Sequence, residues 1–88
     1  MTIHVTSAQM RAARGLLNWS VRELSEHAGV HRNTITNFET GKSGGDPDTL
    51  HRLADALEAA GVIFVAENGE GPGVRLRKAK APHEAGPE

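Results

Sequence analysis

The 88 residues of the chain suffice for one small hydrophobic core and leave no room for a second, catalytic domain. Hydrophobic residues make up 38% and charged residues 24%, which is typical of a globular protein rather than of a disordered tail or a membrane span. The net charge of −1 argues against bulk attraction to nucleic acid, and the absence of cysteine excludes a disulfide framework and a thiolate zinc site.

The first predicted helix begins at Thr6. Thr6 and Gln9 have the spacing of a capping box, in which each side chain binds a free backbone N–H group at a helix start. Residues at helical spacing then predict an apolar face, namely Met10, Ala13, Leu16 and Leu17. Residues 2–5 fit a short strand, but four residues do not decide it.

A second predicted helix begins at Ser20, which forms a capping box with Glu23, and ends at Gly29. Its apolar stripe consists of Val21, Leu24 and Ala28.

The third predicted helix runs from His31 to Thr40 and turns Ile35 and Phe38 inward. Only two residues separate it from the second helix. Short amphipathic helices joined by a tight glycine turn must cross steeply, which is the geometry of a helix-turn-helix unit.

The fourth predicted helix follows a polar loop at residues 41–45. Asp46 serves as its cap, Pro47 takes its first position and Gly61 ends it. Its apolar stripe comprises Leu50, Leu53, Ala54, Leu57 and Ala60.

The periodicity changes after residue 61. Residues 62–65 form an apolar run, 68–73 are rich in turn formers and 74–78 alternate apolar with basic side chains, which together predict a β-hairpin. We therefore expect a mainly α fold of four to five helices, repressor-like, with a C-terminal hairpin. The expected division is a DNA-binding domain at 1–60, the hairpin at 61–78 and a disordered tail at 79–88.

Charge is distributed unevenly along the chain. Residues 46–88 carry a net charge of −3 and residues 1–45 one of +2. Any nucleic-acid surface should therefore lie in the first half. The basic residues there are Arg11, Arg14, Arg22, Arg32 and Lys42, against Glu23, Glu26 and Glu39.

From about Met10 to Leu57 the chain resembles the Xre-like regulators, which include phage repressor and Cro. The resemblance rests on Trp19-Ser20, Glu23-Leu24, Gly29-Val30, Thr34-Ile35 and Phe38-Glu39-x-Gly41. It implies a fold of four or five helices that binds operator DNA, usually as a dimer. It also implies that Glu39 is a structural acid that anchors the end of the third helix.

The outward face of the third helix supplies the expected base contacts. Arginine can form a paired contact with guanine and asparagine with adenine, although such residues can also merely solvate an exposed helix. The expected base-contacting residues are Arg32, Asn33, Thr36 and Asn37.

Phosphate contacts are expected at the start of the second helix and in the loop after the third. The expected residues are Ser20, Arg22, His31, Lys42 and Ser43. Relatives often carry glutamine where this chain has Val21, so we expect that contact to be lost. His31 stands where a serine or threonine cap is usual. Either it touches a phosphate, which protonation would strengthen, or it is an imperfect cap exposed to water.

Two other features each have two interpretations. We favour Trp19 as a staple between the first two helices over stacking on a nucleobase. The basic strand edge formed by Arg75, Arg77, Lys78 and Lys80 either reaches phosphate or prevents unwanted sheet pairing.

An isolated two-stranded ribbon that is apolar on both faces needs cover. One face can lie on the fourth helix, and a second copy of the chain can cover the other. We therefore expect a homodimer that places two recognition helices one DNA turn apart on a palindromic double-stranded operator. The expected dimerisation residues are Val62, Ile63, Phe64, Val65, Val74 and Leu76.

The sequence thus predicts a sequence-specific transcriptional regulator, a repressor or autoregulator. The alternative is an antitoxin-like protein-interaction module in which DNA binding is secondary. With no nucleophile and base pair, no phosphate loop and no metal set, we expect no catalytic residues, no metal and no cofactor. The chain shows neither a spanning apolar run nor a secretory signal, so we expect a cytoplasmic protein without membrane contact.

Overall fold

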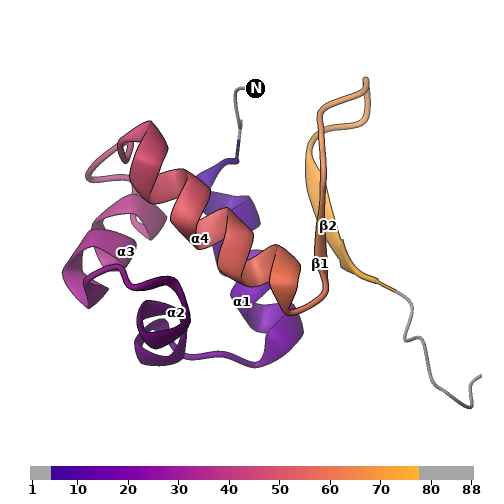
Figure 1. Cartoon of the computed structure of the whole chain (residues 1–88). Helices are drawn as coiled ribbons and strands as arrows, with labels where there is room; N and C mark the ends of the chain where they lie inside the picture. The colour runs from indigo at the N-terminus through magenta and orange to yellow at the C-terminus, as the bar shows by residue number, and fades with distance from the viewer. Residues whose placement is uncertain (1–4, 78–88) are drawn as a thin grey trace, which may run out of the picture.

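The computed structural model describes residues 5–77, and within them four helices precede a two-stranded antiparallel hairpin (Figure 1). This architecture confirms the predicted fold class. Residues 2–4 of the possible N-terminal strand, and the tail from residue 79, lie outside the described residues. The elements are α1 (Ser7–Leu17), α2 (Val21–Ala28), α3 (Arg32–Glu39), α4 (Pro47–Ala59), β1 (Val62–Val65) and β2 (Gly73–Leu76).

Capping side chains set where the helices begin. Both predicted capping boxes are formed: Thr6 Oγ1 accepts the Gln9 N–H at 3.0 Å, and Gln9 Oε1 accepts the Thr6 N–H at 2.9 Å. Ser20 and Glu23 exchange the equivalent bonds at the start of α2. These bonds satisfy backbone donors that have no partner inside the helix.

Asp46 caps α4 by accepting the Thr49 N–H at 3.1 Å, and Pro47 follows at the first helical position. Hydrogen bonds from the side chain and the backbone of Thr49 lower the pKa of the Asp46 carboxyl below its ordinary value. The charged form of Asp46 is therefore the better cap, because a carboxylate also interacts favourably with the positive end of the helix dipole.

The helices enclose one core in which α1 packs beside α3 and α2 beside α4. Its largest fully buried side chains are Met10, Leu24, Ile35, Leu53, Leu57 and Val62. The prediction that Leu16 belongs to the apolar face of α1 is wrong, since Leu16 is 40% exposed. At 100° per residue Leu16 points well away from Met10 and Leu17, which face the core.

The hairpin packs against α1 and α4 and pairs Val62 with Leu76 and Phe64 with Val74. Directly paired residues of an antiparallel sheet project to one side, so these four share a face. Val62 is fully buried in the helical core and Phe64 and Val74 pack against it. The second strand begins at Gly73, one residue before the predicted start.

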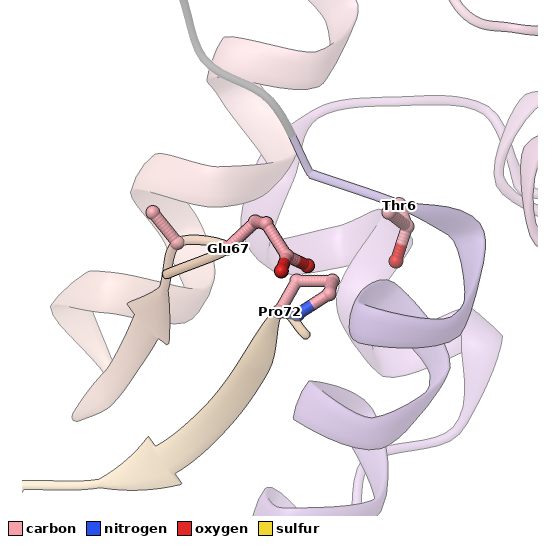
Figure 2. A pocket seen from close by; sticks show the side chains of 4 residues that line it. Thr6, Glu67 and Pro72 are labelled. Carbon is pink, nitrogen blue, oxygen red and sulfur yellow. The ribbon is translucent and has the colours of Figure 1, made fainter. Parts of the chain in front are cut away.

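A shallow hollow of about 460 Å³ lies between the start of α1 and the loop of the hairpin (Figure 2). Thr6, Ala66, Glu67 and Pro72 line it. The Glu67 carboxylate accepts backbone N–H groups of Gly69 and Gly71 at 3.1 Å, so it closes the hairpin loop.

Gln9 joins the hairpin to the helices. Its side chain is 4% exposed, and its amide donates to the carbonyl oxygens of Val65 at 3.2 Å and of Gly73 at 2.9 Å. These two residues face each other across the hairpin, so one amide binds both strands. The sequence indicated only its role in the cap.

We expect Gln9→Ala to lower the free energy of unfolding by about 1–3 kcal/mol, because it removes a buried donor from two carbonyl oxygens as well as the cap partner. Chemical denaturation followed by Trp19 fluorescence measures this. Glu23→Ala is the matched control, since Glu23 has the same position in the capping box of α2 but is exposed. Equal losses in the two variants would contradict the hairpin contribution.

Candidate nucleic-acid interface

The exposed face of α3 carries the four predicted base-contacting residues. Ile35, Phe38 and Glu39 are 0%, 6% and 4% exposed and attach the opposite face to the core. At 100° per residue the remaining side chains point away from that core. The structure brings Arg32, Asn33, Thr36 and Asn37 together on one exposed surface, beside the exposed Thr34.

The start of α3 is capped by His31. The backbone N–H of Asn33 donates to His31 Nδ1 at 3.1 Å. A ring nitrogen accepts only when it is unprotonated, so this cap uses the neutral ring. Protonation would add a positive charge beside α3 and would remove its cap at the same time. The structure therefore shows His31 as a cap, and its contact with phosphate stays a prediction.

The loop after α3 folds back onto its last turn. The Asn37 carbonyl accepts the N–H of Lys42 at 2.8 Å and that of Ser43 at 3.1 Å. These two bonds hold Lys42 and Ser43, which are predicted to contact phosphate, next to Asn37, which is predicted to contact a base. Gly45 has a φ of 72°, and an added Cβ would lie 3.1 Å from Leu50 and 3.3 Å from Phe38, so only glycine fits this turn.

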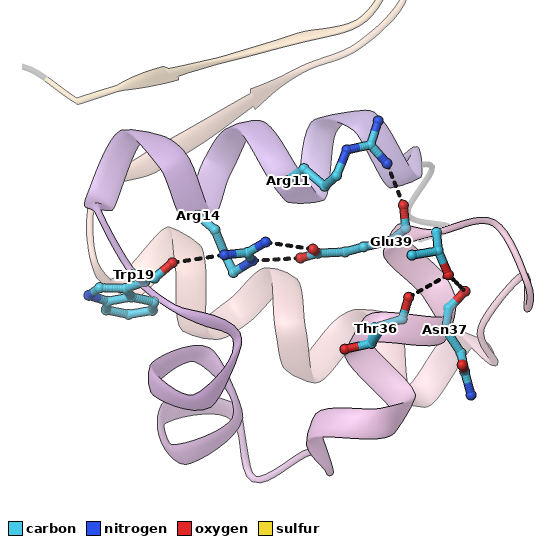
Figure 3. A network of polar contacts seen from close by, with 7 residues as sticks. Arg11, Arg14, Trp19, Thr36, Asn37 and Glu39 are labelled. Atoms are coloured by element: carbon cyan, nitrogen blue, oxygen red, sulfur yellow. Dashed lines mark hydrogen bonds and ion pairs between the residues drawn. The ribbon is translucent and has the colours of Figure 1, made fainter.

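The C-terminal end of α3 is attached to α1 through a buried ion pair (Figure 3). Arg14 donates from Nε and Nη2 to the two Glu39 carboxylate oxygens, both at 2.7 Å, and from Nη1 to the Trp19 carbonyl at 2.9 Å. The Glu39 side chain is 5% exposed and that of Arg14 20%. Arg11 adds a hydrogen bond from its Nη1 to the Glu39 carbonyl.

This pair gives Glu39 the structural role that the resemblance implied. Hydrogen bonding to Glu39 raises the pKa of Arg14, burial opposes that shift and the negative charge of Glu39 adds to it. The planar guanidinium matches both carboxylate oxygens at once, which fixes direction as well as distance. Arg14 therefore positions α3, and its charge is not free for DNA. The sequence indicated Arg14 only as one of the basic residues of the first half.

The predicted phosphate contacts at the start of α2 are engaged within the chain. The Ser20 hydroxyl accepts the Glu23 N–H, and the Glu23 carboxylate places a negative charge at the same helix end. Arg22 forms an exposed ion pair with Glu26 at 3.3 Å. An exposed pair of this kind is weak, so Arg22 can exchange its partner for a phosphate.

Lys42 and Arg32 are the basic residues of the first half whose side chains form neither a hydrogen bond nor an ion pair within residues 5–77, whereas Arg11 donates to the Glu39 carbonyl. Both are exposed, and within residues 5–77 neither forms an ion pair. They lie at the two ends of the α3 surface, one in its first turn and one in the following loop. The two basic side chains without a partner in residues 5–77 therefore both lie at α3.

Trp19 packs against the core beside α2. Its ring stacks on that of His27 with centroids 4.1 Å apart and planes 8° from parallel. The side chain is half-buried, as the favoured interpretation of Trp19 as a staple requires. The exposed His27 therefore covers one face of the Trp19 ring.

Arg75 and Arg77 are exposed on the hairpin, which lies across α1 and α4 from α3 (Figure 1). They are therefore remote from the recognition surface of the same protomer. Lys78 and Lys80 lie outside the described residues.

Among residues 5–77, no three histidine, aspartate or glutamate side chains come close enough to share a metal ion, and no helix is long and apolar enough to cross a membrane. The hollow beside Pro72 lies at the hairpin loop, away from α3, and Glu67, its charged lining residue, is engaged in the turn.

A model of the helix-turn-helix domain family matches residues 7–62. The chain belongs to this family. Membership points to DNA binding and to a family that typically lacks catalytic activity. No curated protein matches the chain at a significant level. The helix-turn-helix match ends at the first residue of β1, so it covers the four helices and leaves the remainder of the hairpin unassigned.

We expect Glu39→Gln to lower the free energy of unfolding by about 3 kcal/mol, because it leaves the Arg14 guanidinium half-buried without a counter-charge. Thermal or urea unfolding measures this. The control is Glu26→Gln, which breaks the exposed pair with Arg22 and should cost less than about 1 kcal/mol. Similar losses in both variants would show that the buried pair does not stabilise the domain.

Two substitutions at His31 distinguish its role as a helix cap from a contact with DNA. His31→Ser keeps a cap oxygen and should leave stability unchanged or raised, whereas His31→Ala should lose about 0.5–2 kcal/mol. If the ring also binds phosphate, His31→Ser weakens DNA binding while unfolding stays unaffected. Equal stability of the serine and alanine variants would contradict the cap.

Proposed function

We propose that this helix-turn-helix protein is a sequence-specific transcriptional regulator of the Xre-like kind that reads the major groove with α3. The observation that carries the proposal is the exposed face of α3, where two asparagines, an arginine and a threonine lie between two structurally fixed helix ends. Side chains that read bases must be held in place, because each contact depends on the register of the helix in the groove.

Each side chain has a proposed task. Arg32 can bind guanine O6 and N7 in a paired contact, and Asn33 or Asn37 can do the same with adenine N6 and N7. Thr36 offers a hydroxyl and a methyl group to the same groove. The proposed phosphate contacts are Lys42, Ser43, His31, Arg22 and Ser20, of which Lys42 is the exposed cation beside α3.

We propose that the protein acts as a homodimer through the hairpin at residues 61–78. Side chains on the outer face of the hairpin, Ile63 and Val65, remain half-exposed in the protomer. Val62, by contrast, is buried within the protomer, so its side chain is not available to a partner. A two-fold dimer would bind a palindromic operator with half-sites one helical turn, or a multiple of it, apart.

We further propose that the regulator is a repressor or autoregulator that responds to its own concentration. A second candidate is an antitoxin-like module that binds a protein partner through the hairpin. The exposure of Leu76, at 45%, favours it, since exposed apolar side chains on a small domain mark contact surfaces.

We expect selection from a random duplex library to enrich a palindromic site for the wild type, and Arg32→Ala/Asn37→Ala to lose that enrichment. Two lost paired contacts should cost about 2–6 kcal/mol of discrimination. Binding at two salt concentrations then separates base contacts from phosphate contacts.

The matched control is Arg52→Ala/Asn68→Ala, which removes the same residue types from α4 and from the hairpin loop. It should select the same site as the wild type. No enrichment by the wild type at low salt would overturn the regulator and favour the protein-partner candidate.

A further inference from the structure

Two large apolar side chains remain exposed in the described part of the protomer, Leu16 at 40% and Leu76 at 45%. Leu16 lies two turns along α1 from Gln9, and Leu76 three residues along β2 from Gly73. Gln9 and Gly73 are hydrogen-bonded at 2.9 Å, and α1 and β2 run in the same direction away from that contact (Figure 1). Two helical turns and three strand residues both span about 10 Å. The two leucines therefore lie at the same end of the α1–β2 pair.

Next to Leu16, α1 exposes a face of small residues. Ala8, Ala12 and Gly15 share this face with Leu16, since they recur at intervals of three and four, and all are exposed. None of them carries a charge. The exposed Arg11 borders this face between Ala8 and Gly15, and its guanidinium reaches away to donate to the Glu39 carbonyl of α3.

The outer edge of β2 is open. Arg77 donates its N–H to the Gly61 carbonyl, and hydrogen-bonded pairs alternate along an antiparallel ladder, so the pairs 63/75 and 65/73 also bond across the hairpin. The N–H and C=O groups of Val74 and Leu76 must then point away from β1. Within residues 5–77 the sheet has only the two strands β1 and β2, so no third strand pairs with these groups.

The outer edge of β1 has different surroundings from the outer edge of β2, because β1 packs on α4 as well as on α1. The exposed face of α4 is charged and carries Asp48, Arg52, Asp55 and Glu58. Two copies joined along β1 would bring these acidic faces together. Joined along β2, they would bring together small and apolar side chains.

We propose that Leu16, the small residues of α1 and the free edge of β2 form one surface, the α1/β2 surface, which binds the same surface of a second copy. The β2 strands of the two copies would pair antiparallel across the two-fold axis, and the two α1 helices would pack beneath the paired strands. The proposal deepens the homodimer proposed above and rests on it. It adds α1 to the interface and selects one edge of the hairpin.

A second copy is the occupant that the chemistry favours. The surface is self-complementary, with apolar side chains opposite apolar ones and free backbone donors opposite acceptors, as a two-fold contact requires. Pairing Leu76 with Val74 or Leu76 of the copy places Arg75 opposite Arg75 or Arg77. Like charges oppose each other there, so the dimer should tighten as salt increases.

The chain lacks cysteine, so single thiols can report which faces meet. We would introduce Ala12→Cys on the α1/β2 surface and Glu58→Cys on α4 into the full chain, and treat both with a short bismaleimide across a concentration series. We expect a covalent dimer from Ala12→Cys alone. A dimer from Glu58→Cys and not from Ala12→Cys would overturn the proposal.

Sedimentation provides the second measurement. Leu76→Glu should weaken self-association at least tenfold, while Ala59→Glu, an exposed position on α4, should not change it. Trp19 fluorescence checks that both variants fold. A wild type that stays monomeric at tens of micromolar and gives no cross-link, as it would if residues 78–88 of the same chain occupied the β2 edge, would overturn the proposal.

DNA binding separates this proposal from the proposed function. We expect Leu76→Glu to bind a single half-site as the wild type does, with the same dependence on Arg32, and to lose only the tighter binding to the palindrome. Binding that depends on Arg32 but comes from a monomer would refute the α1/β2 surface and leave the regulator intact. A dimer that fails to bind DNA would refute the regulator and leave the α1/β2 surface intact.

Discussion

The bidentate ion pair between Arg14 and Glu39 is the interaction on which the arrangement of the helices depends. It joins α1 to the last turn of α3, and a further bond from Arg14 to the Trp19 carbonyl holds the turn into α2. Within residues 5–77 every buried polar side-chain atom has a partner. A buried pair of this kind contributes more to a defined geometry than to stability, because its desolvation offsets much of its attraction.

Helix α1 connects the two ends of the molecule. Through Arg14 and Arg11 it holds the recognition helix, and through Gln9 it holds both strands of the hairpin. Ala8, Ala12, Gly15 and Leu16 form an exposed stripe of α1 that carries no charge. A second copy bound on that stripe, as proposed, would contact the same helix that positions α3, so α1 would connect the proposed dimer contact to the proposed DNA-reading helix.

Local signals made much of this fold predictable. Thr6, Ser20 and Asp46 mark helix starts because their side chains satisfy backbone donors in their own neighbourhood. Gly29, with a φ of 70°, marks the turn before α3 because a left-handed residue there favours glycine. The exposed face of α3 followed from its helical period. By contrast, the partner of Glu39 is 25 residues away in sequence, and no local pattern names it.

The sequence by itself determined the helices, the hairpin and the side chains that face outward from α3, since these depend on contacts between near neighbours. Tertiary structure alone decided which charges are free. Arg14 pairs with Glu39 and Arg22 with Glu26, whereas Arg32 and Lys42 form no ion pair within residues 5–77. It also decided that Gln9 is buried and Leu16 exposed, because burial depends on what the folded chain places on each face.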